Sequence, residues 1–235
     1  MSLTRFVIDR AVGLLGWVRQ GRRLSRLPAT ARGQVCVNLG CGLAVAPGWI
    51  NVDASLNALF GGAPLPLLHL LYRLSGASRY YSRDDYCRLL REHHFVFHDL
   101  ARSLPFPARS VDCYFSSHFF EHLFQADAAR LLRDMHASLK DGGLVRIAVP
   151  DLAFAVALYG KGEKTRMLDD YFFVNDLSSF LARHKYMYDF ELLGGLLREA
   201  GFREIRQCHY REGAVPDLHL LDNRPEETLF VEARR

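Results

Sequence analysis

The chain has 235 residues, 49% hydrophobic and 24% charged, which is the composition of an ordinary soluble globular protein and a length suited to one domain with insertions. Its formal net charge of +4 is too small to argue for nucleic-acid binding. The 5 cysteines are scattered, with no CxxC pair, which indicates free thiols in a reducing compartment. No apolar run reaches the roughly 18 residues of a membrane-spanning helix, and no secretory signal is recognisable, so we expect a cytoplasmic protein.

The N-terminal segment, residues 1–28, is expected to form an amphipathic helix over residues 3–26, because its apolar residues recur at helical spacing. Arginines gather toward the C-terminal end of this helix, and Pro28 ends it. Such a helix could contact the anionic inner surface of a membrane, form a lid over a site, or simply pack on the domain.

The stretch Val35–Asp53 sets the plan of the domain that follows, residues 29–235. A short apolar strand, Gln34–Asn38, runs into the glycine turn Asn38–Gly42, and a second strand, Trp49–Asp53, ends on an acid. This order indicates a nucleotide site, because glycines let the backbone approach a ligand closely and a carboxylate can accept hydrogen bonds from a ribose diol.

The connection between these two strands is unusually short. Only ten residues separate Gly42 from Asp53, too few for a crossover helix of normal length. We therefore expect that helix to be one turn long or absent, which leaves part of one sheet face bare. The N-terminal helix and an irregular insertion over residues 56–94 are the segments expected to cover it and to select the substrate.

Strands and helices alternate along the rest of the chain. The predicted strands are Phe95–His98, Ser110–Phe115, Leu144–Val149, Ile205–Tyr210 and Thr228–Ala233, and the predicted helices are Asp84–Glu92, Phe119–Leu139 and Phe190–Ala200. This alternation predicts an α/β fold with a mainly parallel sheet and helices on both faces. Ligands of such sheets bind outside the carboxyl ends of the strands, which here carry Asn38–Gly42, Asp53, Asp99, Ser116–His118 and Pro150-Asp151.

These strand ends, in this order, resemble the pattern of class I S-adenosylmethionine-dependent methyltransferases, of the type 11 kind. The runs GWINVD, DLxxxLPFxxxSVD, SSHxxEHL and LKxGGxxRIxVPDL are similar to a bacterial subgroup of that family. The resemblance implies a Rossmann-like sheet with an antiparallel last strand, and a small-molecule, glycan or lipid-linked acceptor methylated at O or N.

The resemblance also implies roles for individual residues. The glycine loop, Asn38, Leu39, Gly40, Cys41 and Gly42, would wrap the amino-acid part of S-adenosylmethionine. Asp53 would bind the ribose hydroxyls, Asp99 and Leu100 would meet the adenine, and Ser116 and Ser117 would lie near the reactive methyl group. The family usually has an acid where Asn38 stands, so the ligand ammonium would be held without an ion pair.

Two histidines are candidates for a general base, because imidazole has a suitable unperturbed pKa. His118 follows the fourth strand, and His184 precedes the last helix. His118–His122 also reads HxxEH, an inverted zincin pattern, which would make the chain a zinc hydrolase. A zincin carries that motif inside a helix, whereas here it starts at a strand end, so we expect no metal.

Three alternatives are weighed against methylation of a small-molecule, glycan or lipid-linked acceptor. A Rossmann dehydrogenase is disfavoured because NLGCG lacks the GxGxxG spacing. Nucleobase methylation is disfavoured because the loop after the fourth strand has no Asn/Asp-Pro-Pro-aromatic run, and we expect no nucleic-acid partner. A module that binds S-adenosylmethionine without transferring its methyl group remains an alternative.

Overall fold

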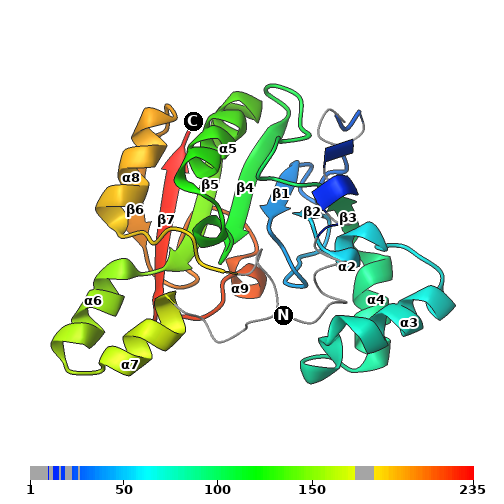
Figure 1. Cartoon of the computed structure of the whole chain (residues 1–235). Helices are drawn as coiled ribbons and strands as arrows, with labels where there is room; N and C mark the ends of the chain where they lie inside the picture. The colour runs from blue at the N-terminus through cyan, green and yellow to red at the C-terminus, as the bar shows by residue number, and fades with distance from the viewer. Residues whose placement is uncertain (1–9, 11–12, 16, 19–22, 26, 173–182) are drawn as a thin grey trace.

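The computed structural model describes residues 10, 13–15, 17–18, 23–25, 27–172 and 183–235 and contains one seven-stranded sheet (Figure 1). The strands are β1 (Cys36–Leu39), β2 (Ile50–Asp53), β3 (His94–Phe97), β4 (Val111–Ser117), β5 (Leu139–Pro150), β6 (Arg203–Cys208) and β7 (Thr228–Arg234). Their order across the sheet is β3-β2-β1-β4-β5-β7-β6. β1 to β5 pair in parallel, and β7 is antiparallel to both of its neighbours, as the resemblance implied.

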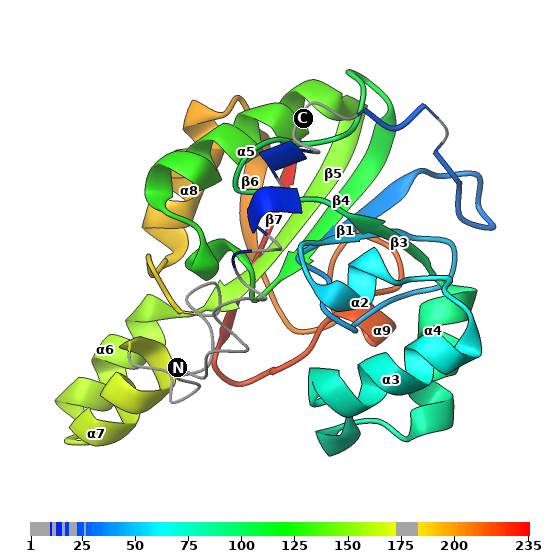
Figure 2. The ribbon, with the colours of Figure 1, turned by 45° about the vertical axis from the view of Figure 1, so that its right-hand side comes forward.

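Helices cover the sheet and its edge. They are α2 (Leu56–Leu59), α3 (Leu65–Ser75), α4 (Arg83–Glu92), α5 (Gln125–Ser138), α6 (Leu152–Gly160), α7 (Lys164–Met167), α8 (Phe190–Glu199) and α9 (Leu218–Leu221). Short 3-10 turns span Ala77–Arg79 and Phe120–His122, and a π turn spans Leu168–Phe172. α5 and α8 lie side by side over one face of the sheet, whereas α3 and α4 lie beyond β3 (Figures 1 and 2).

The main core lies between the sheet and the helices α5 and α8. Alternate strand residues such as Val37, Tyr114 and Ile147 point into it and meet Leu132 and Leu197 of these helices. α8 begins at Phe190, as the sequence predicts. Asp189 caps α8 by accepting a hydrogen bond from the backbone N–H of Leu192 at 2.8 Å.

The opposite face of β1 and β4 has no crossover helix. Residues 40–49, all of them described, form turns and contain no helix, in agreement with the short spacing. The cover comes instead from the connection between β6 and β7, where Val215, Leu218 and Leu221 pack with Trp49 on the strands. This connection is the cover that the described residues place over β1 and β4, whereas α2 packs on Phe95 and Phe97 of β3. Most of the predicted N-terminal helix lies outside the described residues, so its part in the cover stays a prediction.

Residues 56–94 are the enlarged crossover between β2 and β3. α3 and α4 form a small core of their own around Leu68, Tyr86 and Leu90, and this core touches Leu43 beside the glycine loop. The segment thus forms a small helical unit that packs beside β3, the edge strand of the sheet. The sequence predicts an irregular insertion with one helix, Asp84–Glu92. In the structure its apolar run from Leu65 also forms a helix, α3, which is capped by Gly76 in the left-handed conformation.

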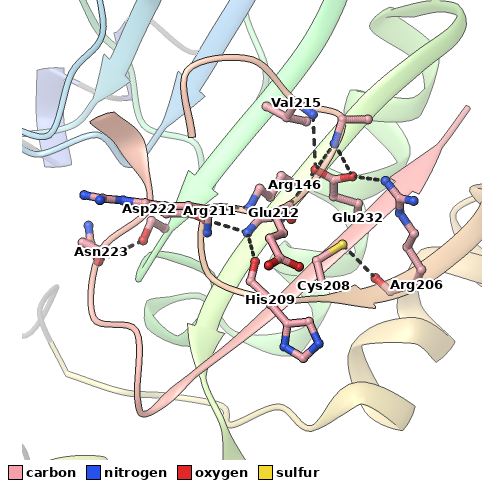
Figure 3. Close-up of polar contacts among 12 residues, drawn as sticks. Arg146, Arg206, Cys208, His209, Arg211, Glu212, Val215, Asp222, Asn223 and Glu232 are labelled. Carbon is pink, nitrogen blue, oxygen red and sulfur yellow. Dashed lines mark hydrogen bonds and ion pairs between the residues drawn. The ribbon is translucent and has the colours of Figure 1, made fainter. Parts of the chain in front are cut away.

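Arg146 of β5 holds the covering connection in place, and its side chain is fully buried (Figure 3). Its guanidinium makes a two-pronged contact with Asp222, at 2.9 and 2.5 Å, and lies 3.4 Å from a carboxylate oxygen of Glu232. It also donates to the backbone carbonyls of Glu212 and His209, at 2.9 and 3.0 Å. The planar, five-donor group of arginine suits this arrangement, which a lysine could not satisfy.

Both carboxylates are satisfied by further donors. Asp222 accepts from the backbone N–H of Arg211 at 2.7 Å, and Glu232 accepts from the N–H of Ala214 and Val215. Burial acts to raise the pKa of Glu232, but the hydrogen bond from Arg206 and those from the two N–H groups outweigh it, so the pKa lies below its usual range. The carboxylate therefore stays ionised opposite Arg146.

Two predicted helices compare differently with the structure. The predicted helix Phe119–Leu139 begins only at Gln125, after the 3-10 turn Phe120–His122. The predicted helix over residues 3–26 lies largely outside the described residues. Of its described residues, Leu15 packs beside Ala58 and Phe97, whereas Leu14, Trp17 and Val18 are exposed. Contact of this segment with a membrane stays a prediction.

The state of the cysteines and the length of the helices bear on two further expectations. All 5 cysteines are free thiols, as expected for a reducing compartment. Among the described residues, no helix has the length and apolar character needed to cross a bilayer.

Substituting Arg146 tests the anchoring role of this network. Arg146→Leu leaves the carboxylate of Asp222 buried without its cation and removes one of the two arginines from Glu232, so we expect the free energy of unfolding to fall by about 3–5 kcal/mol. Urea denaturation measures it. The matched control is Arg88→Leu, which removes an exposed pair with Asp85 and should cost less than about 1 kcal/mol. An equal, small effect of both substitutions would contradict the anchoring role.

Candidate functional site

The carboxyl ends of the parallel strands meet at one edge of the sheet, as the sequence predicted. β1 ends in the glycine loop, β2 ends at Asp53, and Asp99 follows β3. β4 runs on to Ser117, and its register with β1 pairs Ser116 with Leu39. The predicted site residues are thus brought to one region, where parallel sheets of this kind bind their ligands.

The glycine loop needs its glycines for two different reasons. Gly40 has φ +65°, and a Cβ atom there would lie 2.3 Å from the side chain of Phe119. Gly42 has φ +51°, and a Cβ atom there would meet no atom within 4 Å. The loop is therefore packed against Phe119 on one side and open beside Gly42, where the backbone can approach a ligand.

Several predicted cofactor residues hold the loop in shape. Asn38 is buried, and its amide nitrogen donates to the carbonyl of Ala44 at 2.7 Å and to Asn51 Oδ1 at 3.2 Å. Both of its amide hydrogens are thus used inside the protein. Ser116 donates to the carbonyl of Leu39 at 3.1 Å and ties β4 to β1. These contacts explain the departure at position 38: the amide braces the turn through a donor that an acid would lack.

Cys41 of the same loop is buried and is not a nucleophile. Burial, followed by the nearby carboxylate of Asp53, raises the pKa of its thiol well above the usual value. The thiol therefore stays protonated. Its part in the loop is to fill space beside the backbone.

Asp53 and Asp99 both present carboxylates at strand ends. Asp53 accepts from the backbone N–H of Gly42 at 2.9 Å and of Ser55 at 2.8 Å, one contact on each oxygen. Each oxygen keeps a second acceptor site, which is what a ribose diol requires. Asp99 accepts from Ala101 N–H at 3.1 Å and pairs with Arg102 at 2.9 Å, and its side chain is 23% exposed. Leu100 points into the core.

Beyond β4 the chain turns sharply and brings the imidazoles of His118 and His122 close to the carboxylate of Glu121. His118 has φ +50°, a left-handed conformation that is uncommon outside glycine. Its Nδ1 lies 3.5 Å from Oε1 of the buried Glu121, and its Nε2 lies 3.1 Å from Thr228 Oγ1. Nε2 of His122 lies 3.8 Å from the same carboxylate oxygen. Ser117 contacts Asn223 at 3.3 Å.

The segment Arg183–Asp189 closes this turn from the other side. Lys185 donates to the carbonyls of Glu121 and His122, from its backbone N–H and its ammonium group respectively, each at 2.7 Å. Tyr188 bridges to Asp151 at the end of β5. His184 is held so that its ring lies 5.1 Å from the ring of His122, centroid to centroid. The two predicted base candidates, His118 and His184, therefore flank one carboxylate.

The sequence analysis considers Glu121 and His122 only as parts of a zinc-hydrolase motif, which it disfavours. The HxxEH spacing was the available signal. Because a 3-10 turn replaces the predicted helix, the histidines curl around Glu121 instead of lining one helical face. Burial lowers the pKa of His122, and the charge of Glu121 only partly offsets this, so the ring is neutral at neutral pH.

A hollow of about 570 Å³ lies away from these strand ends, between α3 and α4. Its lining is charged and includes Arg83, Arg88, Arg91 and Asp84. Ligand sites in proteins are mostly apolar with a few convergent polar groups, which this lining is not. The strand ends, and not this hollow, are therefore the candidate site.

Comparisons with known proteins bear on the fold and on one part of the chain. A family model described as "Methyltransferase domain" matches residues 74–147, which include Asp99 and the turn after β4. The match begins after the glycine loop and covers about a third of the chain. No curated protein sequence matches the chain.

Solved structures share the fold. A structure described as a SAM-dependent methyltransferase from Archaeoglobus fulgidus superposes with a TM-score of 0.51 at 14% identity, over 98% of this chain and 94% of that one. The S-adenosylmethionine-dependent methyltransferase SibL in its apo form gives 0.50 at 18% identity, over 86% and 50%. The chain thus has the fold of these methyltransferases, and its residues 74–147 are similar to a methyltransferase domain.

Proposed function

We propose that the chain transfers the methyl group of S-adenosylmethionine to an oxygen or nitrogen atom of a small-molecule, glycan or lipid-linked acceptor. The observation that carries this proposal is the position of the imidazole cluster, formed by His118, His122 and His184 around the carboxylate of Glu121. His118 and Glu121 flank Phe119, whose ring packs on Gly40 of the glycine loop. Groups that can take up a proton thus lie directly beside the predicted donor site.

The residues present suit this donor. Gly42 leaves open space beside a backbone with positive φ, and the carboxylate of Asp53 has acceptor sites left for a ribose diol. When bound, S-adenosylmethionine supplies a methyl group on a sulfonium, which leaves as a neutral thioether as the acceptor atom forms its bond to the methyl carbon. The protein's part is to align the acceptor, exclude water and remove a proton.

The proton has two candidate destinations. His118 is 13% exposed, so its ring is sheltered but reachable. The Nδ1 of His184 lies 2.6 Å from the carbonyl of Tyr171, which can only accept, so Nδ1 carries the hydrogen and Nε2 of the neutral ring is free to take a proton. The neighbouring Glu121 carboxylate would stabilise either ring once it is charged.

Turnover of the two histidine variants tests the proposed base. General-base catalysis contributes about 10²- to 10⁴-fold, so we expect His118→Ala or His184→Ala to lose at least about 10²-fold in kcat with an unchanged dissociation constant for the donor. The exposed His219→Ala is the control. Normal turnover by both variants would refute the base assignment. Donor binding by the wild type without any turnover, across a panel of hydroxyl and amine acceptors, would favour a binding module.

Asp53 is the residue whose loss should weaken donor binding most cleanly. Hydrogen bonds to a charged group contribute about 1.5–3 kcal/mol, so Asp53→Ala is expected to raise the dissociation constant of S-adenosylhomocysteine by at least about tenfold in calorimetry. Asp84→Ala, which removes a carboxylate with an 87% exposed side chain on α4, should leave it unchanged. Equal affinity of the Asp53 variant and the wild type would remove the ribose assignment.

A further inference from the structure

The Glu121 carboxylate is buried without a hydrogen bond. Its side chain is 1% exposed, and neither of its oxygens has a hydrogen-bond partner among the described residues. A buried carboxylate is costly unless donors or a cation compensate for its lost hydration. Among the described residues, the ion-pair partners within 4 Å of it are the imidazoles of His118 and His122, at 3.5 and 3.8 Å, and neither is an arginine or lysine. A bound cation would compensate for the lost hydration.

The neighbouring histidines are oriented as metal ligands usually are. His122 Nδ1 lies 3.2 Å from the carbonyl of Arg183, and His184 Nδ1 lies 2.6 Å from the carbonyl of Tyr171. Carbonyl oxygens only accept, so each Nδ1 carries the hydrogen, and the unprotonated nitrogen of each neutral ring is Nε2. Metal-binding histidines nearly always donate their other N–H to a carbonyl or carboxylate in this way.

The three side chains converge on one point. One ligand atom from each of Glu121, His122 and His184 lies within 4.8 Å of the other two. Ligand atoms of a tetrahedral ion with bonds of about 2.1 Å are about 3.4 Å apart. Side-chain rotations that move the ligand atoms by about an ångström would therefore bring all three to bonding distance of one ion. The carboxylate and the two nitrogen lone pairs repel one another unless a cation lies between them.

The geometry points to a binding site for one divalent transition-metal ion, held by Glu121, His122 and His184 at the carboxyl end of β4. With the ion bound, Nε2 of His184 is a ligand, and His118 is the base that remains. Two imidazoles and one carboxylate suit Zn²⁺, Mn²⁺ or Fe²⁺ better than Ca²⁺ or Mg²⁺, which take mainly oxygen ligands. Three protein ligands leave at least one position for a further oxygen atom. Sequence analysis had expected no metal because it considered only hydrolysis within a helix.

The position of this ion bears on the acceptor, and that step rests on the proposed function. Phe119 lies in the same turn as the ligands Glu121 and His122 and packs on Gly40, so the ion would belong to the same packed unit as the donor loop. A metal lowers the pKa of a bound hydroxyl and orients it. The site therefore favours a hydroxyl oxygen as the methyl acceptor over an amine nitrogen.

Metal binding can be measured without donor or acceptor, so its failure and that of methyl transfer are distinguishable. Full-length protein without a histidine tag is stripped with a chelator and titrated with Zn²⁺ in a calorimeter, and in parallel with Co²⁺, whose visible absorption reports nitrogen and oxygen ligands. We expect one equivalent of Zn²⁺ to bind. Glu121→Gln, His122→Ala and His184→Ala should each weaken binding by at least about tenfold, comparable with the losses seen when metal-site partners are removed.

His219→Ala, an exposed histidine on α9, is the matched control and should bind as the wild type does. Far-ultraviolet circular dichroism and thermal unfolding show that each variant is folded. Absence of stoichiometric Zn²⁺ binding by the wild type would overturn the proposal. Binding that survives all three substitutions would place the metal elsewhere, for example on the half-exposed Cys208, and would overturn it equally.

Discussion

The short connection from β1 to β2 is the constraint on which the rest of the structure depends. It leaves no room for a crossover helix, so one face of β1 and β4 must be covered by a distant part of the chain. The buried Arg146 holds the β6–β7 connection against the sheet through its ion pairs with Asp222 and Glu232 (Figure 3). Trp49 adds a link, since its indole N–H donates to Asp217 at 2.9 Å. The missing helix is thus replaced by a segment held largely by charge-assisted hydrogen bonds.

The same constraint positions the site. With no helix after the glycine loop, the loop is braced from within by Asn38 and Ser116 and from outside by Phe119. Phe119 belongs to the turn that carries His118 and Glu121, so the donor loop and the imidazole cluster are parts of one packed unit. A small shift of either would move the other, which is the arrangement that alignment of two reacting groups requires. The unusual backbone of His118 is held by this packing.

Sequence patterns predicted the parallel sheet, the strand ends and the acids at Asp53 and Asp99, because short apolar runs and glycine turns are local signals. The absence of the first crossover helix followed from a residue count. The single-turn helix α9 could not be foreseen, since its place depends on the contact between Arg146 and Asp222, 76 residues apart. Likewise, nothing local links His184 to Glu121, and only the fold brings them together. The helix expected from Phe119 failed because its apolar residues pack around a tight turn.

A crystal structure with bound S-adenosylhomocysteine tests the central claim most directly, that donor loop and imidazole cluster form one site. The account predicts ribose hydroxyls on Asp53, the adenine amine at Asp99, and the thioether sulfur on the side of the loop that faces His118 and Glu121. A ligand bound in the charged hollow between α3 and α4, or one whose sulfur points away from this turn, would contradict it.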